Sequence, residues 1–163
     1  MKVLIVGGSG NVATWTLPYM SPHHEFRVLD VRPPRENGLE YVEGSITDPE
    51  SLRRALNGVD SFVNMVMMSP TSPHSNEASV QDILDNYRIN TLGLHLLLQT
   101  AQSMGIMTGV HTSTFTVHSR DRMRYTSEEE LPLDNPGVYG LTKGLGERIC
   151  QYFCNEFGMS LVA

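Results

Sequence analysis

The chain has 163 residues, a length that suits a single domain able to bury most of its apolar surface. With 40% hydrophobic and 18% charged residues it is neither a disordered tail nor a fibre. A formal net charge of -6 argues against nucleic acid or an anionic membrane as the main partner. The apolar stretches are also far shorter than the ~20 residues that a membrane span needs.

Apolar runs typical of buried parallel strands, such as residues 2–6, alternate with stretches of helical character. Asp48 and Pro49 open one helix, with aspartate at the N-cap and proline at the first helical position. In chain order we expect a strand at 2–6, a helix at 11–20, strands at 26–30 and 39–43, a helix from 49 to a close at 57, a strand at 61–67, a helix at 77–104, a strand at 106–112, a helix at 137–156 and the beginning of a sixth strand at 160–163. This alternation predicts an α/β fold, a doubly wound parallel sheet with right-handed crossovers. The least structured stretches, 69–76 and 119–135, follow strands, where ligand-facing loops belong in such folds.

The first strand runs into a glycine-rich turn, GGSGNVA. Gly7 permits the tight turn, Gly10 lets the backbone approach a pyrophosphate, and Ala13 keeps the next helix close to the strand. The helix N-terminus offers free N–H groups and a partial positive charge to the phosphates. Asp30 ends the next strand, where its carboxylate can accept hydrogen bonds from ribose hydroxyls and repel a 2′-phosphate. These features predict a dinucleotide site that prefers NAD to NADP.

Other interpretations of these residues stay open. Many glycine turns bind nothing, and Asp30 could be a turn-forming residue ahead of Pro33 and Pro34. Arg32 and Arg35 could partly accommodate a 2′-phosphate, so NAD is a preference over NADP rather than a certainty.

Tyr139 and Lys143 stand four residues apart in the last predicted helix, so they share one of its faces. A free phenol has a pKa of about 10, too high for a base at neutral pH, and a fixed cation nearby lowers it. The pair is therefore a candidate proton acceptor for a substrate hydroxyl. The alternative is an ordinary exposed pair on an amphipathic helix. The preceding nucleotide motif, and a strand that ends in hydroxyl residues, favour the catalytic interpretation.

Two cysteines, Cys150 and Cys154, lie one turn apart on the same predicted helix. That spacing can seat a metal, but no pair of histidines lies nearby in the sequence. We therefore expect two reduced thiols in a cytosolic protein and no metal site.

Several segments, in this order, resemble one family over essentially the whole chain. They are GGSGNVA, Asp30, EGSITDPESL, NYRINTLGLHLLLQTA, HTSTFTVHS and TSEEELPLDNPGVYGLTKGLGE. The chain is similar to the extended short-chain dehydrogenase/reductases, the NAD-dependent epimerase/dehydratase family. The resemblance implies a Rossmann-like domain that holds NAD, and a small-molecule substrate such as a nucleotide sugar or a related hydroxy or keto compound. It also implies a homodimer formed through the helices that carry Asn90 and Tyr139.

Site residues carried over by position follow from this resemblance. Tyr139 would be the catalytic acid/base, and Lys143 would lower its pKa and bond the nicotinamide ribose. Thr114 occupies the position of the catalytic hydroxyl, with Ser113 as a neighbour that could share the role; its plain alternative is a residue of high β propensity. The implied chemistry is hydride transfer between a carbinol carbon and the nicotinamide. The implied cofactor-binding residues are Gly7, Gly10, Asn11, Val12, Asp30, Ser45, Ile46, Val66, Asn90 and Lys143.

Three departures from the family pattern qualify these expectations. The family's dehydratases have an acidic pair after the catalytic threonine, whereas this chain has Phe115 and Thr116, so dehydration is not expected. Ser45 stands where an aspartate usually reads the adenine amino group. Val66 and Met67 stand where the family keeps small residues, so they could crowd the dinucleotide or be accommodated by a backbone shift.

Family members continue for roughly as many residues again and add a substrate-binding domain. We therefore expect residues 1–163 to be an NAD-binding domain cut within the sixth strand, without the C-terminal substrate-binding domain. Two other functions stay open, namely a non-catalytic dinucleotide-binding sensor and a structural dimerisation domain. The set of Thr114, Tyr139 and Lys143 favours an enzyme, whereas Ser45 and Met67 mildly favour a sensor.

Overall fold

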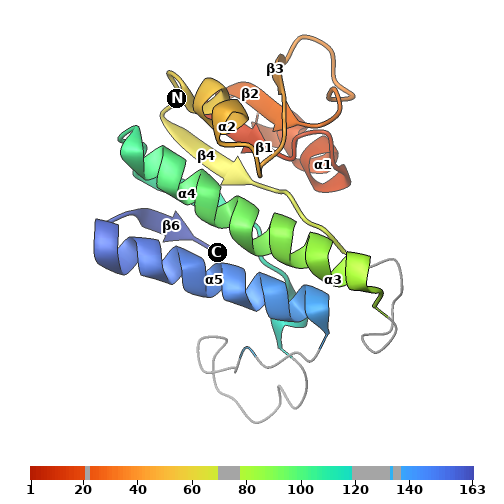
Figure 1. The fold of residues 1–163 in the computed structure, drawn as a ribbon. Coiled ribbons are helices and arrows are strands. Elements are labelled where there is room, and N and C mark those ends of the chain that lie inside the picture. Colours follow the sequence, from red (N-terminus) through yellow and green to blue (C-terminus); the bar gives the residue numbers. More distant parts are fainter. Residues whose placement is uncertain (21–22, 70–77, 119–132, 134–136) are drawn as a thin grey trace.

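A six-stranded parallel sheet forms the centre of the computed structural model, which describes residues 1–20, 23–69, 78–118, 133 and 137–163 (Figure 1). Its strand order is β3-β2-β1-β4-β5-β6. The strands are β1 (Lys2–Val6), β2 (Glu25–Asp30), β3 (Glu40–Glu43), β4 (Ser61–Asn64), β5 (Thr108–His111) and β6 (Ser160–Val162). Every pair of neighbours is parallel, so the predicted doubly wound sheet is confirmed.

Helices occupy the connections that the sequence predicts. They are α1 (Asn11–Met20), α2 (Pro49–Leu56), α3 (Val80–Asn86), the π-helix η2 (Tyr87–Gly93), α4 (Leu94–Ser103), the 3₁₀ helix η3 (Phe115–Val117) and α5 (Val138–Phe157). The predicted helix at 77–104 is therefore three consecutive helical segments, with π geometry in the middle. The predicted loops at 69–76 and 119–135 lie almost entirely outside the described residues.

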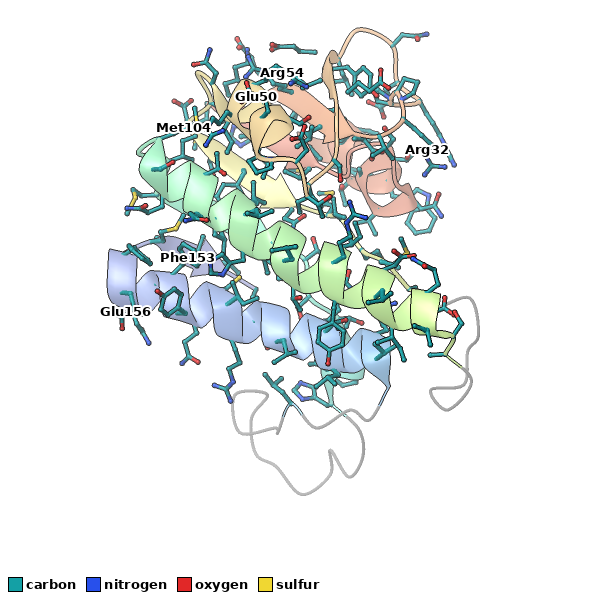
Figure 2. All side chains as sticks on the ribbon, in the orientation of Figure 1. Arg32, Glu50, Arg54, Met104, Phe153 and Glu156 are labelled. Carbon is teal, nitrogen blue, oxygen red and sulfur yellow. The ribbon has the colours of Figure 1, made fainter. Side chains whose placement is uncertain are left out.

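Helix α2 begins as its sequence predicts. The carboxylate of Asp48 accepts hydrogen bonds from the backbone N–H groups of Glu50 and Ser51, and Pro49 occupies the first turn. The hydroxyl of Ser51 also donates to Asp48, and these bonds lower the pKa of the Asp48 carboxyl. The outer face of this helix carries Glu50 and Arg54 (Figure 2).

The helices cover the sheet as two unequal layers. Helix α1 packs on one face, over a small core that includes Ile5, Leu17 and Val28. Helices α2, α4 and α5 pack on the other face, where the larger core lies. Phe153 of α5 belongs to that core and meets the ring of His95 of α4 edge-on, with centroids 5.2 Å apart (Figure 2). Helices α4 and α5 lie side by side on this face (Figure 1).

Strand β4 is shorter than predicted, ending at Asn64 rather than at Met67. Its neighbour β1 ends at Val6, and the next residue, Gly7, turns the chain away with a φ of 85°. Without a partner strand beyond that point, the apolar residues after Asn64 leave the ladder and form part of a pocket wall instead.

Candidate functional site

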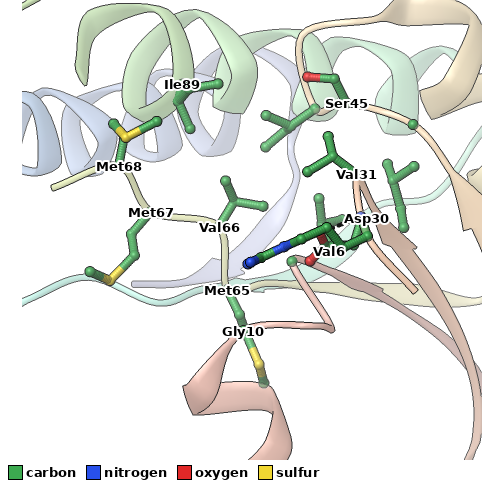
Figure 3. A pocket seen from close by; sticks show the side chains of 15 residues that line it. Val6, Gly10, Asp30, Val31, Ser45, Met65, Val66, Met67, Met68 and Ile89 are labelled. Carbon is green, nitrogen blue, oxygen red and sulfur yellow. Dashed lines mark hydrogen bonds between the residues drawn. The ribbon is translucent and has the colours of Figure 1, made fainter. Parts of the chain in front are cut away.

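A pocket of about 290 Å³ opens where β1, β2 and β4 end (Figure 3). Six of the predicted cofactor-binding residues line it: Gly7, Gly10, Asp30, Ser45, Ile46 and Val66. Asp30, Val31 and Ser45 form one side of it, and the segment after β4, from Met65 to Met68, forms the other (Figure 3). The carboxyl end of a parallel sheet, where the strand order changes direction, is the usual ligand site of such folds.

The glycine turn has the tight geometry that the sequence predicts. Gly7 has a φ of 85°, and a Cβ added to it would lie 2.8 Å from the backbone nitrogen of Val66. Its N–H donates to the carbonyl of Leu29 at 2.8 Å, and its own carbonyl accepts the N–H of Gly10 at 3.1 Å. The turn is thus held between β2 and the exit of β4, with the N-terminus of α1 directly behind it.

Asp30 is fixed by two backbone groups. One of its carboxylate oxygens accepts the N–H of Ser9 at 3.0 Å, and the other accepts the N–H of Arg32 at 3.1 Å. The second bond is the turn-forming role considered from the sequence, while the first connects Asp30 to the glycine turn. Because each carboxylate oxygen has more than one acceptor site, these bonds leave capacity for ribose hydroxyls. The two interpretations of Asp30 are therefore compatible.

The proposed adenine side of the pocket is formed by Ser45 and Ile46. The hydroxyl of Ser45 lies 2.9 Å from that of Thr47 and accepts the backbone N–H of Thr47 at 3.2 Å. Ile46 is buried and belongs to the larger core. Ser45 thus takes part in a small turn of its own as well as lining the pocket.

Asn11, Val12 and Asn90 are not among the lining residues. Asn11 and Val12 begin α1 beyond Gly10. Asn90 is buried in η2. Its side-chain amide forms two hydrogen bonds with the backbone of Met68: it accepts the Met68 N–H at 2.8 Å and donates to the Met68 carbonyl at 2.9 Å. Their contacts with a cofactor stay predictions.

Tyr139 and Lys143 have very different surroundings. The Tyr139 hydroxyl donates to the sulfur of Met67 at 3.7 Å, and Met67 lines the pocket. Lys143 is only 1% exposed. Its Nζ lies 3.3 Å from Nε2 of His111 and donates a hydrogen bond to the carbonyl of Thr112. The alternative of an ordinary exposed pair is therefore wrong for Lys143.

The hydroxyl residues after β5 are also engaged. Thr114 caps η3, where its hydroxyl accepts the N–H of Thr116 at 3.3 Å and lies 3.0 Å from the Thr116 hydroxyl. Ser113 donates to the carboxylate of Glu147 on α5. The residue after β5 that is tied to α5 through its side chain is thus Ser113, and the catalytic role of Thr114 stays a prediction.

Burial shifts the pKa of several groups along α5. It lowers the pKa of Lys143 to about 8, although Cys150 and Glu147 act in the opposite direction. It raises the pKa of Cys150 to about 12. His111 has its pKa lowered to about 3, first by burial and then by the charge of Lys143. Both cysteines are free thiols, and among the residues that the structure describes no group of three His, Cys, Asp or Glu could hold a metal ion.

Two residues of this region escaped the sequence reasoning, namely Asn64 and His111. Each places a large polar side chain within a mainly apolar run that predicts a buried strand. Because a buried polar side chain requires a hydrogen-bond partner, such an interruption was the available signal.

Comparison with known proteins identifies the family of this chain. A model of the NAD dependent epimerase/dehydratase family matches residues 3–163. The chain belongs to this family. The predicted family and fold are confirmed, and NAD is the cofactor on which this family depends.

Relatives of named function are similar to this chain over nearly its whole length. This chain is 24% identical over 163 residues to a UDP-glucose 4-epimerase of Neisseria meningitidis serogroup B, covering 91% of this chain and 47% of the relative. It is 27% identical over 158 residues to a 3 beta-hydroxysteroid dehydrogenase/Delta 5-->4-isomerase of Mycobacterium tuberculosis, covering 90% and 41%. A short-chain dehydrogenase/reductase superfamily protein from Agrobacterium tumefaciens, solved with bound NAD, superposes with a TM-score of 0.84 at 26% identity, covering 99% and 47%. The chain thus spans about half the length of these relatives.

Within the described part of the chain, no helix combines the length and the apolar character needed to cross a membrane.

Proposed function

We propose that this chain carries the NAD-binding part of an epimerase or dehydrogenase that acts on a nucleotide sugar or a related hydroxy or keto compound. One observation supports this most directly. The pocket is lined by the glycine turn and Asp30, and also by Met67, whose sulfur receives the hydrogen bond of Tyr139. The proposed acid/base therefore contacts a side chain of the same cavity that the cofactor residues line.

The residues of the pocket fit NAD. A Cβ on Gly10 would meet only the carbonyl of Gly7, at 3.2 Å, so the turn presents bare backbone to a pyrophosphate beside the N-terminus of α1. Asp30 offers acceptors to the adenosine ribose. Arg32 also lines the pocket, and a guanidinium nitrogen of Arg35 lies 3.5 Å from the side-chain oxygen of Asn11. We therefore expect NAD to bind more tightly than NADP, with the two arginines limiting the difference.

Bound NAD would supply the hydride acceptor for a substrate carbinol. Tyr139 would take the hydroxyl proton at its phenol oxygen, and Thr114 would orient the reacting oxygen by a hydrogen bond. A protonated Lys143, one turn from Tyr139, would favour the phenolate. The similarity to an enzyme named UDP-glucose 4-epimerase supports the sugar-nucleotide class, while the relative named as a hydroxysteroid dehydrogenase supports simple oxidation.

Calorimetric titration with NAD and NADP tests the cofactor part of this proposal. We expect preferential NAD binding that Asp30→Ala abolishes. Asp60→Ala is the matched control, because Asp60 is exposed and holds only the N–H of Lys2, at the other end of β1. If neither NAD nor NADP binds, the proposal is overturned. NAD binding without hydride transfer by the whole protein would instead favour a non-catalytic dinucleotide-binding module.

We also propose that two copies pair through the helices that carry Asn90 and Tyr139. Both helical segments expose large apolar side chains, such as Leu92 on η2 and Leu145 on α5, which are 51% and 38% exposed. Sedimentation velocity should show a dimer that Leu145→Glu weakens. Tyr19→Glu places the same charge on an exposed aromatic of α1 and should leave the dimer intact. A monomeric wild-type chain would contradict this pairing.

A further inference from the structure

Three buried polar side chains form a chain of hydrogen bonds between the sheet and α5. Asn64 comes from β4, His111 from β5 and Lys143 from α5, and they are 2%, 3% and 1% exposed. The amide nitrogen of Asn64 lies 3.1 Å from Nδ1 of His111, and Nζ of Lys143 lies 3.3 Å from Nε2. Both ring nitrogens of His111 therefore face a nitrogen atom of a neighbour.

The orientation of Asn64 is set by the backbone. Its side-chain oxygen lies 3.1 Å from the backbone nitrogen of Val66, a group that can only donate. The oxygen must stay on that side, so the amide NH₂ faces His111. Because an amide NH₂ also only donates, Nδ1 of His111 must be an acceptor and carry no proton.

The proton of neutral His111 is then on Nε2, facing Lys143. An ammonium group has three donors and no acceptor, so it cannot accept this N–H, whereas a neutral amine can. The neutral amine can still donate to the carbonyl of Thr112, its other partner. The contacts of Asn64, His111 and Lys143 are thus all satisfied in one protonation state, with neutral histidine and neutral lysine.

We propose that Asn64 and His111 are positioning residues for Lys143: Asn64 holds His111 in the Nε2–H tautomer, and this N–H stabilises the neutral amine of Lys143. Gly146 leaves room for this arrangement, since a Cβ there would lie 3.2 Å from Nε2 of His111. The other titratable groups that act on Lys143 are Cys150 and Glu147 of its own helix.

Neither of these two neighbours reverses the effect. Burial raises the pKa of Cys150 to about 12, which keeps its thiol neutral, and Glu147 accepts a hydrogen bond from Ser113. Burial is the largest influence on Lys143 and lowers its pKa. The hydrogen bond from His111 acts in the same direction.

The catalytic consequence rests on the proposed function, in which the charge of Lys143 activates Tyr139. An ordinary lysine, with a pKa of about 10.4, keeps its proton throughout the neutral range. A lysine whose neutral form is stabilised can release and take up a proton near neutral pH. The charge available to Tyr139 would then be set by Asn64 and His111, two side chains buried behind the site.

Nitrogen NMR can test this directly, because the sequence contains only two lysines, Lys2 and Lys143. In the variant Lys2→Arg, ¹⁵N-lysine labelling reports Lys143 alone. Labelling of the histidines, with the His111 signals assigned by their loss in His111→Phe, shows which ring nitrogen carries the proton. We expect the proton on Nε2 at pH 7 and a Lys143 pKa well below about 10.4. A proton on Nδ1, or a Lys143 that titrates near that ordinary value, would overturn the proposal.

Asn64→Asp should reverse the tautomer. A carboxylate can accept both the N–H of Val66 and a proton on Nδ1, so Nε2 would become bare and accept from a Lys143 ammonium. We expect the Lys143 pKa to rise by at least about one unit, a tenfold gain in proton affinity. Asn57→Asp adds the same charge at the exposed C-cap of α2 and should leave both signals unchanged. An Nε2–H tautomer that persists in Asn64→Asp would sink the proposal.

The outcomes separate this inference from the proposed function. The NMR measurements need no nucleotide, and the tautomer of His111 with Asn64 in place decides the matter even where Asn64→Asp does not fold. If the protein shows the predicted tautomer but does not bind NAD, the proposed function is rejected and the role of Asn64 and His111 as positioning residues stands. NAD binding with the opposite tautomer would do the reverse.

Discussion

The cofactor side of the pocket is formed mainly by backbone groups, whereas the catalytic side is formed by side chains. On the cofactor side the surface is mainly backbone. Gly7 and Gly10 present no side chain, and Asp30 is held by N–H groups of the turns on either side of it. Such a site follows from a short, continuous run of sequence, because the chain only has to turn tightly between a strand and a helix.

On the catalytic side the surface depends on side chains brought together from distant parts of the chain. Lys143 is placed by His111 and Thr112 of the neighbouring strand segment, and His111 is placed by Asn64 of the next strand. Here no local motif specifies the arrangement, and burial controls the chemistry through the pKa values. Changes on the cofactor side should therefore act through sterics and binding, and changes on the catalytic side through protonation.

The largest effect should come from Gly7→Ala, which attacks the cofactor side sterically. An alanine there would adopt a left-handed φ of 85° and place its Cβ 2.8 Å from the backbone nitrogen of Val66. The left-handed conformation costs roughly 1–2 kcal/mol and the overpacking typically about 1–3 kcal/mol. We expect urea denaturation to show a free energy of unfolding about 3 kcal/mol lower.

Gly58→Ala is the matched control for this change. Gly58 has a φ of 72°, but a Cβ there has nothing within 4 Å. Only the conformational cost applies, so the loss should be about 1–2 kcal/mol. Equal losses in the two variants would show that the contact with Val66 yields freely and that the turn tolerates a side chain.

The second prediction concerns the pH dependence of stability on the catalytic side. Lys143 has a pKa of about 8 in the folded chain, below its value of about 10.4 when unfolded. Between these values the unfolded chain binds more protons, so the free energy of unfolding rises with pH. Cys150 has a folded pKa of about 12, above its unfolded value of about 8.5. Its contribution to the free energy of unfolding therefore falls as the pH rises above about 8.5. From about pH 8.5 to 10 the two contributions oppose each other.

Replacing either Lys143 or Cys150 should reveal the pH-dependent contribution of the other residue to stability. In Lys143→Met the free energy of unfolding should fall by up to about 2 kcal/mol from pH 8.5 to 10, and in Cys150→Ala it should rise by a similar amount. Urea denaturation at both pH values measures these slopes, and comparing slopes removes the cost of the cavity in Cys150→Ala. Identical slopes in Lys143→Met and Cys150→Ala would contradict the opposing contributions.

Much of the fold could be predicted because strands buried on both faces and capped helices leave strong local patterns. The end of β4 could not, since it depends on where its neighbour turns away at Gly7. Likewise, the four-residue spacing places Tyr139 and Lys143 on one helix face but does not say which way their side chains reach. Lys143 is buried because His111 and a backbone carbonyl of β5's extension provide partners for it, and these lie more than thirty residues earlier. Contacts of that separation are fixed by the assembled sheet and not by any local pattern.

The smallest effect should be a gain on the cofactor side, from Ser45→Asp. By resemblance to the family, an aspartate here would accept a hydrogen bond from the adenine amino group. It could also keep both existing contacts with Thr47, because a carboxylate can accept the backbone N–H that Ser45 accepts now and can also accept from the Thr47 hydroxyl. One net hydrogen bond contributes about 1 kcal/mol, so calorimetry should show NAD affinity rising roughly fivefold. Ser45→Ala, which lacks the acceptor, should show no gain. An unchanged affinity in Ser45→Asp would mean that the adenine ring does not lie against Ser45, and the dinucleotide would then have to be oriented in the pocket by the glycine turn and Asp30 alone.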